Sequence, residues 1–123
     1  MALPIRILVV DDAAFMRKMI RDIFASEDFE VVGEAQNGRE AIERFRELQP
    51  DLVTMDIVMP EMGGIEATRE LLALRPDAIV LICSALGQET LVMEAIEAGA
   101  SDFIVKPFNP VDVLSVVRKV MGR

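Results

Sequence analysis

Short apolar runs alternate with segments of helical period along the whole chain. The runs lie near residues 5–10, 30–35, 51–56, 78–83 and 102–106, and each has the length of a buried strand. Between the runs, apolar residues recur at helical spacing, as in Met16, Ile20 and Ile23. Strands that alternate with helices pair in parallel, and the helices cover both faces of the sheet. The sequence therefore predicts an α/β fold, a three-layer doubly wound (βα)5 sandwich with right-handed crossovers.

The length of the chain fits one such unit. At 123 residues it can bury one core but not a second, so we predict a single domain over residues 1–123 with its core at about 5–121. No apolar stretch approaches the roughly 20 residues that cross a bilayer, and no cleavable signal pattern precedes the first strand. We therefore expect a cytoplasmic monomer without a membrane partner, and the single Cys83 fits a reducing compartment.

Charge and missing residue types exclude several classes of function. The net charge is −8, with 21 acidic against 13 basic residues, so a nucleic acid backbone would be repelled. The chain has no histidine, tyrosine or tryptophan. This excludes an imidazole base, zinc held by histidine and serine–histidine hydrolysis. Any chemistry must use carboxylates, lysine, hydroxyls, backbone groups and a bound ion.

Polar side chains end four of the apolar runs. They are Asp11 and Asp12 after the first run, Asp56 at the third, Ser84 at the fourth and Lys106 at the fifth. Because parallel strands end at one edge of the sheet, we expect these side chains to gather there, where open α/β sheets bind ligands. Such a set suits the attack of a carboxylate on a phosphoryl group, since phosphoryl transfer depends on positioning and on neutralising the phosphoryl oxygens.

Each of these residues also has an ordinary structural explanation. Asp12 is a favourable N-cap for the helix that follows, Ser84 suits a cap or turn, and Lys106 alone would be a solvated lysine. Asp11 weakens the first explanation, because a cap needs one carboxylate and paired ionised carboxylates usually mean a bound cation. Pro107 makes the Lys106–Pro107 bond a candidate cis peptide.

Several motifs in a fixed order resemble those of the response-regulator receiver domains, in particular the stand-alone chemotaxis regulators among them. The motifs are Asp11-Asp12, the loop 56–64, Cys83-Ser84-Ala85, Gly99-Ala100 and the segment 103–108. The resemblance extends from Ile5 to about Met121. It implies a flavodoxin-like sheet with strand order 2-1-3-4-5.

The resemblance also implies the roles of the site residues. Asp56 would be the phosphoacceptor and would bind Mg²⁺, or Mn²⁺ in its place, together with Asp12 and the backbone carbonyl of Val58. Asp11 would contribute to the metal site through water. Lys106 would contact the phosphoryl group.

A second set of residues would carry the signal. By resemblance, Ser84 would hydrogen-bond the phosphoryl group and Phe103 would occupy the switch aromatic position, without the hydroxyl of a tyrosine. Movement at Ser84 would then repack the face formed by the fourth helix, fifth strand and fifth helix. Val58 and Leu86 are apolar where polar side chains could position a hydrolytic water, so we expect the phosphoryl group to be lost slowly.

The resemblance further implies a signalling protein, not an enzyme, that catalyses its own phosphotransfer and slow autodephosphorylation. Its partners would be a histidine kinase as phosphodonor, the flagellar motor switch as target and an auxiliary phosphatase. Alternatives are a receiver cut from a larger transcriptional regulator and a flavodoxin-like FMN electron carrier. An aspartyl-phosphate phosphatase is a further alternative, but such enzymes usually place a second aspartate where this chain has Val58.

Overall fold

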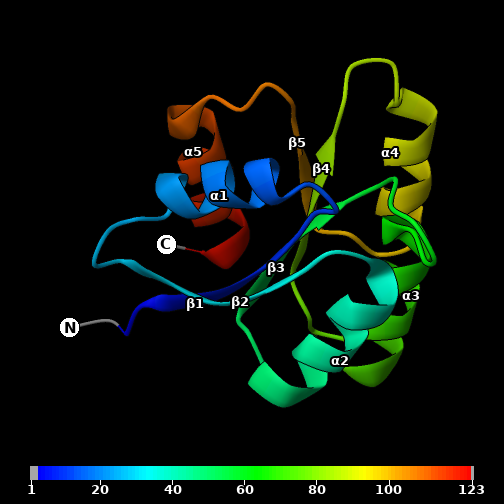
Figure 1. The fold of residues 1–123 in the computed structure, drawn as a ribbon, viewed down its shortest axis with the longest axis horizontal. Coiled ribbons are helices and arrows are strands. Elements are labelled where there is room, and N and C mark those ends of the chain that lie inside the picture. The colour runs from blue at the N-terminus through cyan, green and yellow to red at the C-terminus, as the bar shows by residue number, and fades with distance from the viewer. Residues whose placement is uncertain (1–2, 123) are drawn as a thin grey trace.

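The computed structural model describes residues 3–122, which form one parallel sheet with helices on both of its faces (Figure 1). The elements in chain order are β1 (Ile5–Val10), α1 (Ala14–Ile23), β2 (Phe29–Ala35), α2 (Gly38–Leu48), β3 (Leu52–Asp56), α3 (Gly64–Leu74), β4 (Val80–Ser84), α4 (Glu89–Glu97), β5 (Asp102–Val105) and α5 (Pro110–Met121). The strand order is β2-β1-β3-β4-β5, which confirms the predicted fold class.

The predicted strand limits are accurate to within two residues. The largest difference is at β4, which begins at Val80 and not near residue 78. The amide of Ala78 instead donates to the carbonyl of Arg75 at 2.9 Å, in a turn that follows α3. β4 reaches Ser84, which is therefore paired with Val105 of β5 at the edge of the sheet.

The central strands are buried on both faces. Every residue of β3 and of β4 is buried, which explains why these strands read as continuous apolar runs and not as alternating patterns. In the sheet, Val10 lies opposite Met55, and Asp56 lies opposite Cys83. This register brings the ends of β1, β3 and β4 to one edge, next to the end of β5.

Two layers of apolar side chains hold the helices to the sheet. On one face, α1 and α5 cover a cluster that includes Phe24, Leu81 and Val117 (Figure 1). On the other face, α2, α3 and α4 cover a cluster that includes Phe45 and Leu71. Burial of these side chains is the main driving force for the fold. Within residues 3–122, no helix combines the length and the apolar composition that a membrane span requires.

Gly64 allows α3 to begin directly against the end of β3. A Cβ atom at this position would collide with the carbonyl oxygen of Asp56, so glycine is required where the two elements meet. The amide of Gly64 donates to the carbonyl of Ile57 at 2.8 Å. Gly64, the first residue of α3, is therefore a packing contact beneath the edge of the sheet.

The hydroxyl of Thr54 is fully buried and has no hydrogen-bond partner within the described chain. Thr54 lies in β3 between Val9 and Leu81. We expect Thr54→Val to raise the free energy of unfolding by about 1 kcal/mol, because it replaces an unsatisfied buried group with an apolar one of the same shape. Urea denaturation measures the change in the free energy of unfolding, provided that the variant and the wild type have the same m-value.

Thr68→Val is the matched control for this substitution. Thr68 is also fully buried, but its hydroxyl donates to the carbonyl of Gly64 at 2.7 Å. We expect the free energy of unfolding of this variant to be about 1 kcal/mol lower than that of the wild type. A loss of stability in Thr54→Val similar to that in Thr68→Val would show that the Thr54 hydroxyl is bonded in solution.

Candidate functional site

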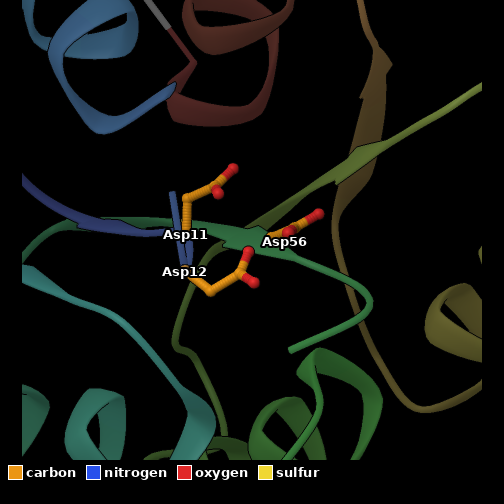
Figure 2. A group of neighbouring side chains, drawn as sticks. All are labelled: Asp11, Asp12 and Asp56. Carbon is orange, nitrogen blue, oxygen red and sulfur yellow. The ribbon is translucent and has the colours of Figure 1, made fainter. Parts of the chain in front are cut away.

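Three aspartates converge at the carboxyl edge of the sheet. Asp11 and Asp12 follow β1, Asp56 ends β3, and Figure 2 shows their side chains extending to the same side of the edge. One carboxylate oxygen of each lies within 4.8 Å of the other two. Asp11 and Asp56 are buried, whereas Asp12 is exposed. The structure therefore brings together the three carboxylates that the sequence placed at this edge.

Asp11 is held from several directions. Its Oδ1 accepts a hydrogen bond from the amide of Ala13 at 2.9 Å, and its Oδ2 accepts one from Nζ of Lys106 at 3.2 Å. Its own amide donates to the carbonyl of Ala35 in β2 at 3.0 Å. Both oxygens of this carboxylate are thus engaged by the protein.

The N-cap explanation of Asp12 is wrong. The N-cap of α1 is Ala13, and no side chain caps this helix. Among residues 3–122, no protein group is hydrogen-bonded to the Asp12 carboxylate, which leaves it available for a ligand. The amide of Ala13 itself is bonded to the carboxylate of Asp11 at 2.9 Å.

Lys106 joins two of the aspartates. Its Nζ lies 3.2 Å from Oδ2 of Asp11 and 3.3 Å from Oδ1 of Asp56. Partial burial opposes its charge, but the carboxylates of Asp56 and Asp11 raise the pKa of Lys106 above its ordinary value. The following bond, Lys106–Pro107, is cis as predicted.

The carboxylate of Asp56 has one engaged and one free oxygen. Its Oδ1 accepts from the amide of Ile57 at 3.0 Å and from Nζ of Lys106 at 3.3 Å. Its Oδ2 has no hydrogen-bond partner in the described part of the chain. Burial and the charge of Asp11 raise the pKa of Asp56, Lys106 lowers it in part, and the net result is a pKa of about 6. A second cation would therefore stabilise the ionised form.

The donor set fits a hard divalent cation. The site has three carboxylates and one ammonium group, so it carries excess negative charge when all the groups are ionised. Mg²⁺ prefers oxygen ligands and usually keeps several waters, which suits a cluster with one exposed carboxylate. We conclude that Asp11, Asp12 and Asp56 are compatible with Mg²⁺ binding.

Val58 lies in the loop between β3 and α3, and more than half of its surface is exposed. The loop is tied to α2 at two points: Nδ2 of Asn37 donates to Glu61 at 2.9 Å, and the amide of Gly38 donates to the carbonyl of Met62 at 2.8 Å. A metal-binding role for the Val58 carbonyl remains a prediction.

Ser84 and Phe103 lie beside the aspartates rather than among them. Ser84 is buried, and its hydroxyl donates to the carbonyl of Ile104 at 3.4 Å, so it faces β5 in this structure. The ring of Phe103 is 41% exposed. Both residues line a largely apolar cavity of about 250 Å³ between α4 and β5, together with Val92 and Met93.

One contact of the acidic pair was not predicted from the sequence. Nη1 of Arg17 in α1 donates to the backbone carbonyl of Asp11 at 2.7 Å, and its Nε bonds Glu34 of β2 at 2.9 Å. The available signal was weak: an arginine one helical turn beyond the acidic pair, and a glutamate near the end of the neighbouring strand. No residue pattern specifies a bond to a backbone carbonyl.

Comparison with known proteins identifies relatives of the whole chain. The family model of the response regulator receiver domain matches residues 7–118. The chemotaxis protein CheY of Thermotoga maritima is 57% identical over 115 residues, which cover 94% of this chain and 96% of that protein. CheY of Bacillus subtilis is 55% identical, with 95% and 98% covered. A chain in the crystal structure of the CheX–CheY–BeF3–Mg²⁺ complex from Borrelia burgdorferi is 38% identical, with a TM-score of 0.91 and 97% and 90% covered.

Proposed function

The chain belongs to the response regulator receiver domain family, and from this we propose that it is a chemotaxis regulator activated by phosphorylation of Asp56. The observation that carries the proposal is the arrangement of this carboxylate. Its Oδ1 is held by Lys106 and a backbone amide, its Oδ2 has no hydrogen-bond partner within residues 3–122, and one oxygen of this carboxylate lies within 4.8 Å of oxygens of Asp11 and Asp12. A fixed carboxylate with one free oxygen is what an in-line attack on phosphorus requires.

In the proposed reaction, Oδ2 of Asp56 attacks the phosphorus atom of a phosphohistidine on a separate kinase. The bond from phosphorus to the imidazole nitrogen breaks, an acyl phosphate forms, and the imidazole takes a proton from solvent. Lys106 neutralises the incoming oxygens. The donor must lie on another protein, because this chain has no histidine.

Asp12, Asp56 and the Val58 carbonyl would bind Mg²⁺ directly, with Mn²⁺ as a substitute, and Asp11 would act through water. The ion would supply charge neutralisation at the phosphoryl oxygens. The contacts of the two N-terminal aspartates agree with this division, since both Asp11 oxygens are engaged by protein groups and Asp12 is exposed.

We propose that the chain is a signalling protein that loses its phosphoryl group slowly without help. Val58 is 58% exposed and Leu86 is 80% exposed, and neither side chain can orient a water for attack on the acyl phosphate. An auxiliary phosphatase would then terminate the signal. Decay of the radiolabelled acyl phosphate with Mg²⁺ checks this, and a lifetime of seconds or less would contradict it.

Ser84 and Phe103 would convert phosphorylation into a change of surface. The present bond of the Ser84 hydroxyl is long, at 3.4 Å, so a phosphoryl oxygen is a better acceptor. If Ser84 turns toward it, the adjoining cavity can receive the Phe103 ring. A hydrogen bond to a charged group contributes about 1.5–3 kcal/mol, and burial of an aromatic ring contributes about as much. A nearly complete shift between the inactive and active conformations requires roughly 5.5 kcal/mol, so both contributions are needed to approach it.

The surface that would change is the face of α4, β5 and α5. It already exposes apolar side chains, among them Met93, Phe103, Val105 and Val111. We propose that this face binds a flagellar motor switch protein, and that the chain acts as a cytoplasmic monomer. Two relatives named as chemotaxis proteins support a stand-alone regulator over a receiver excised from a transcription factor, since 96% and 98% of their lengths are covered.

Addition of beryllofluoride, which mimics a phosphoryl group on aspartate, tests the proposal. We expect Mg²⁺ with beryllofluoride to shift the NMR signals of the site, of Ser84 and Phe103, and of α5 in one transition. Mg²⁺ alone and the variant Asp56→Asn are the controls, and neither is expected to shift α5. Shifts confined to Asp12, residue 56 and Lys106 would show binding without output and would contradict the proposed switch.

A further inference from the structure

Arg17 connects the acidic pair to the neighbouring strand. Its guanidinium group donates through Nη1 to the backbone carbonyl of Asp11 at 2.7 Å and through Nε to Oε1 of Glu34 at 2.9 Å. The side chain of Arg17 is only 17% exposed. A planar guanidinium group that bonds two acceptors has one orientation, so the side chain acts as a rigid brace between α1, β2 and the end of β1.

The carbonyl that Arg17 binds belongs to the peptide unit between Asp11 and Asp12. The preceding peptide is fixed by the bond from the Asp11 amide to the Ala35 carbonyl, and the following amide, of Ala13, bonds the Asp11 side chain. The carboxylate of Asp12 has no such support within residues 3–122. Its direction therefore depends on the orientation of the peptide unit that Arg17 holds.

The contacts of Arg17 indicate that it affects the acidic site through geometry and not through its charge. Its charge is balanced by Glu34, which also bonds Nε of Arg21 at 3.3 Å. Within the described chain, Arg17 forms no ion pair with the carboxylates of Asp11, Asp12 or Asp56. Arg17 thus touches the site through a backbone carbonyl, whereas Arg21 shares its partner without touching the site.

We propose that Arg17 is a positioning residue for the divalent cation, which holds the Asp11–Asp12 peptide so that the Asp12 carboxylate points into the site. This inference rests on the proposed Mg²⁺ site. Groups that orient metal ligands from outside the coordination sphere typically change metal affinity by about 10–100-fold when they are removed. Arg17 would act on affinity and leave the phosphoryl chemistry itself unchanged.

The experiment compares Arg17→Met with Arg21→Met by calorimetric titration of the metal-free proteins with Mg²⁺. Each variant loses one positive charge near the site, which by itself strengthens cation binding. We expect Arg17→Met to bind Mg²⁺ about tenfold more weakly and Arg21→Met to bind it as tightly as the wild type or slightly more so. Weaker binding after loss of a positive charge can come only from lost positioning.

Phosphorylation by acetyl phosphate supplies a second measurement. For Arg17→Met, we expect the Mg²⁺ concentration at half the maximal rate to rise about tenfold, while the rate at saturating Mg²⁺ stays near that of the wild type. Arg17→Lys keeps the charge and can reach only one of the two acceptors, so we expect an intermediate affinity. Circular dichroism confirms the fold of each variant.

Three outcomes would overturn the inference. The first is wild-type Mg²⁺ affinity in a folded Arg17→Met protein, even if its melting temperature falls, since Arg17 would then be structural only. The second is equal weakening in Arg17→Met and Arg21→Met. The third applies if Arg17→Met does not fold, and it is an Mg²⁺ affinity of Arg17→Lys equal to that of the wild type. If the wild type itself does not bind Mg²⁺, the proposed function fails together with the role of Arg17. If only the Arg17 variants give one of the three outcomes above, the role of Arg17 fails and the proposed function stands.

Discussion

Asp56→Asn is expected to reduce phosphoryl uptake from acetyl phosphate to background and to make the metal-free protein more stable at neutral pH. The first effect follows because the amide cannot act as the attacking carboxylate. The second follows because Asp56 is buried beside Asp11 and its pKa is raised to about 6. Removing a charge that the site disfavours should raise the free energy of unfolding by about 1–2 kcal/mol.

The pH dependence of stability gives the sign of this second effect. The pKa of Asp56 is about 6 in the folded chain, whereas the ordinary pKa of an aspartate, which applies in the unfolded chain, is 3.8. The folded state therefore binds the proton more tightly than the unfolded state does. The stabilisation that this proton gives is complete below pH 3.8 and is lost as the pH rises through about 6. We expect the wild type, but not Asp56→Asn, to show this loss in urea denaturation with a chelator between pH 4 and 7.

Asp22→Asn is the matched control for the Asp56 variant. It makes the same chemical change on α1, where Asp22 is exposed and, within residues 3–122, forms an ion pair with Lys18 alone, at 3.0 Å. We expect wild-type uptake of phosphate and a pH profile parallel to that of the wild type. Radiolabel uptake at the wild-type rate by Asp56→Asn would refute the assignment of the phosphoacceptor, and a parallel pH profile for that variant would refute the raised pKa.

The convergence of the polar residues was predictable because it depends only on strand direction. Once the chain is read as alternating strands and helices, the residues that follow β1, β3 and β5 must meet at one edge of the sheet. Asp11, Asp56 and Lys106 do meet there, and Lys106 bridges the other two. The strand order could not be predicted in this way, because no spacing in the sequence specifies it. It was implied by the family resemblance.

The contacts that depend on neighbours in space were not predictable. The Arg17 brace requires that Glu34 of β2 and the Asp11 carbonyl lie on the same side of α1, which only the packed fold decides. The Asp12 cap was a reasonable local choice, but the N-cap of α1 is Ala13, one residue later, and its first turn has no side-chain cap bond. Ser84 reaches the predicted edge, yet its hydroxyl donates to the carbonyl of Ile104 on the adjacent strand at 3.4 Å.

Lys106→Met is expected to change metal affinity and reaction rate in opposite directions. Lys106 lies within 3.3 Å of carboxylate oxygens of both Asp11 and Asp56, so it competes with a cation for the same negative charge. Its removal should tighten Mg²⁺ binding severalfold. The rate of phosphorylation at saturating Mg²⁺ should fall about 10²-fold, the typical cost of removing one group that stabilises transition-state charge.

The loss of Lys106 should also destabilise the metal-free protein. Two buried carboxylates would lose their shared ammonium group, at a cost of about 1–3 kcal/mol, which is less than for a fully buried pair because Lys106 is 23% exposed. Mg²⁺ should restore most of this loss. Lys119→Met is the control, since Lys119 is exposed and, in the described part of the chain, pairs with Asp102 alone.

Calorimetry and radiolabel uptake on the same Lys106→Met sample separate two roles of this lysine. If it only balanced charge in the resting site, Mg²⁺ would replace it fully, and the phosphorylation rate at saturating Mg²⁺ would equal that of the wild type. If it contacts the phosphoryl group, the rate stays low however much Mg²⁺ is added, because the ion does not replace the hydrogen bonds and charge that Lys106 supplies to the transferring oxygens. Tighter Mg²⁺ binding with a wild-type rate would therefore contradict the proposed role of Lys106 in phosphoryl transfer.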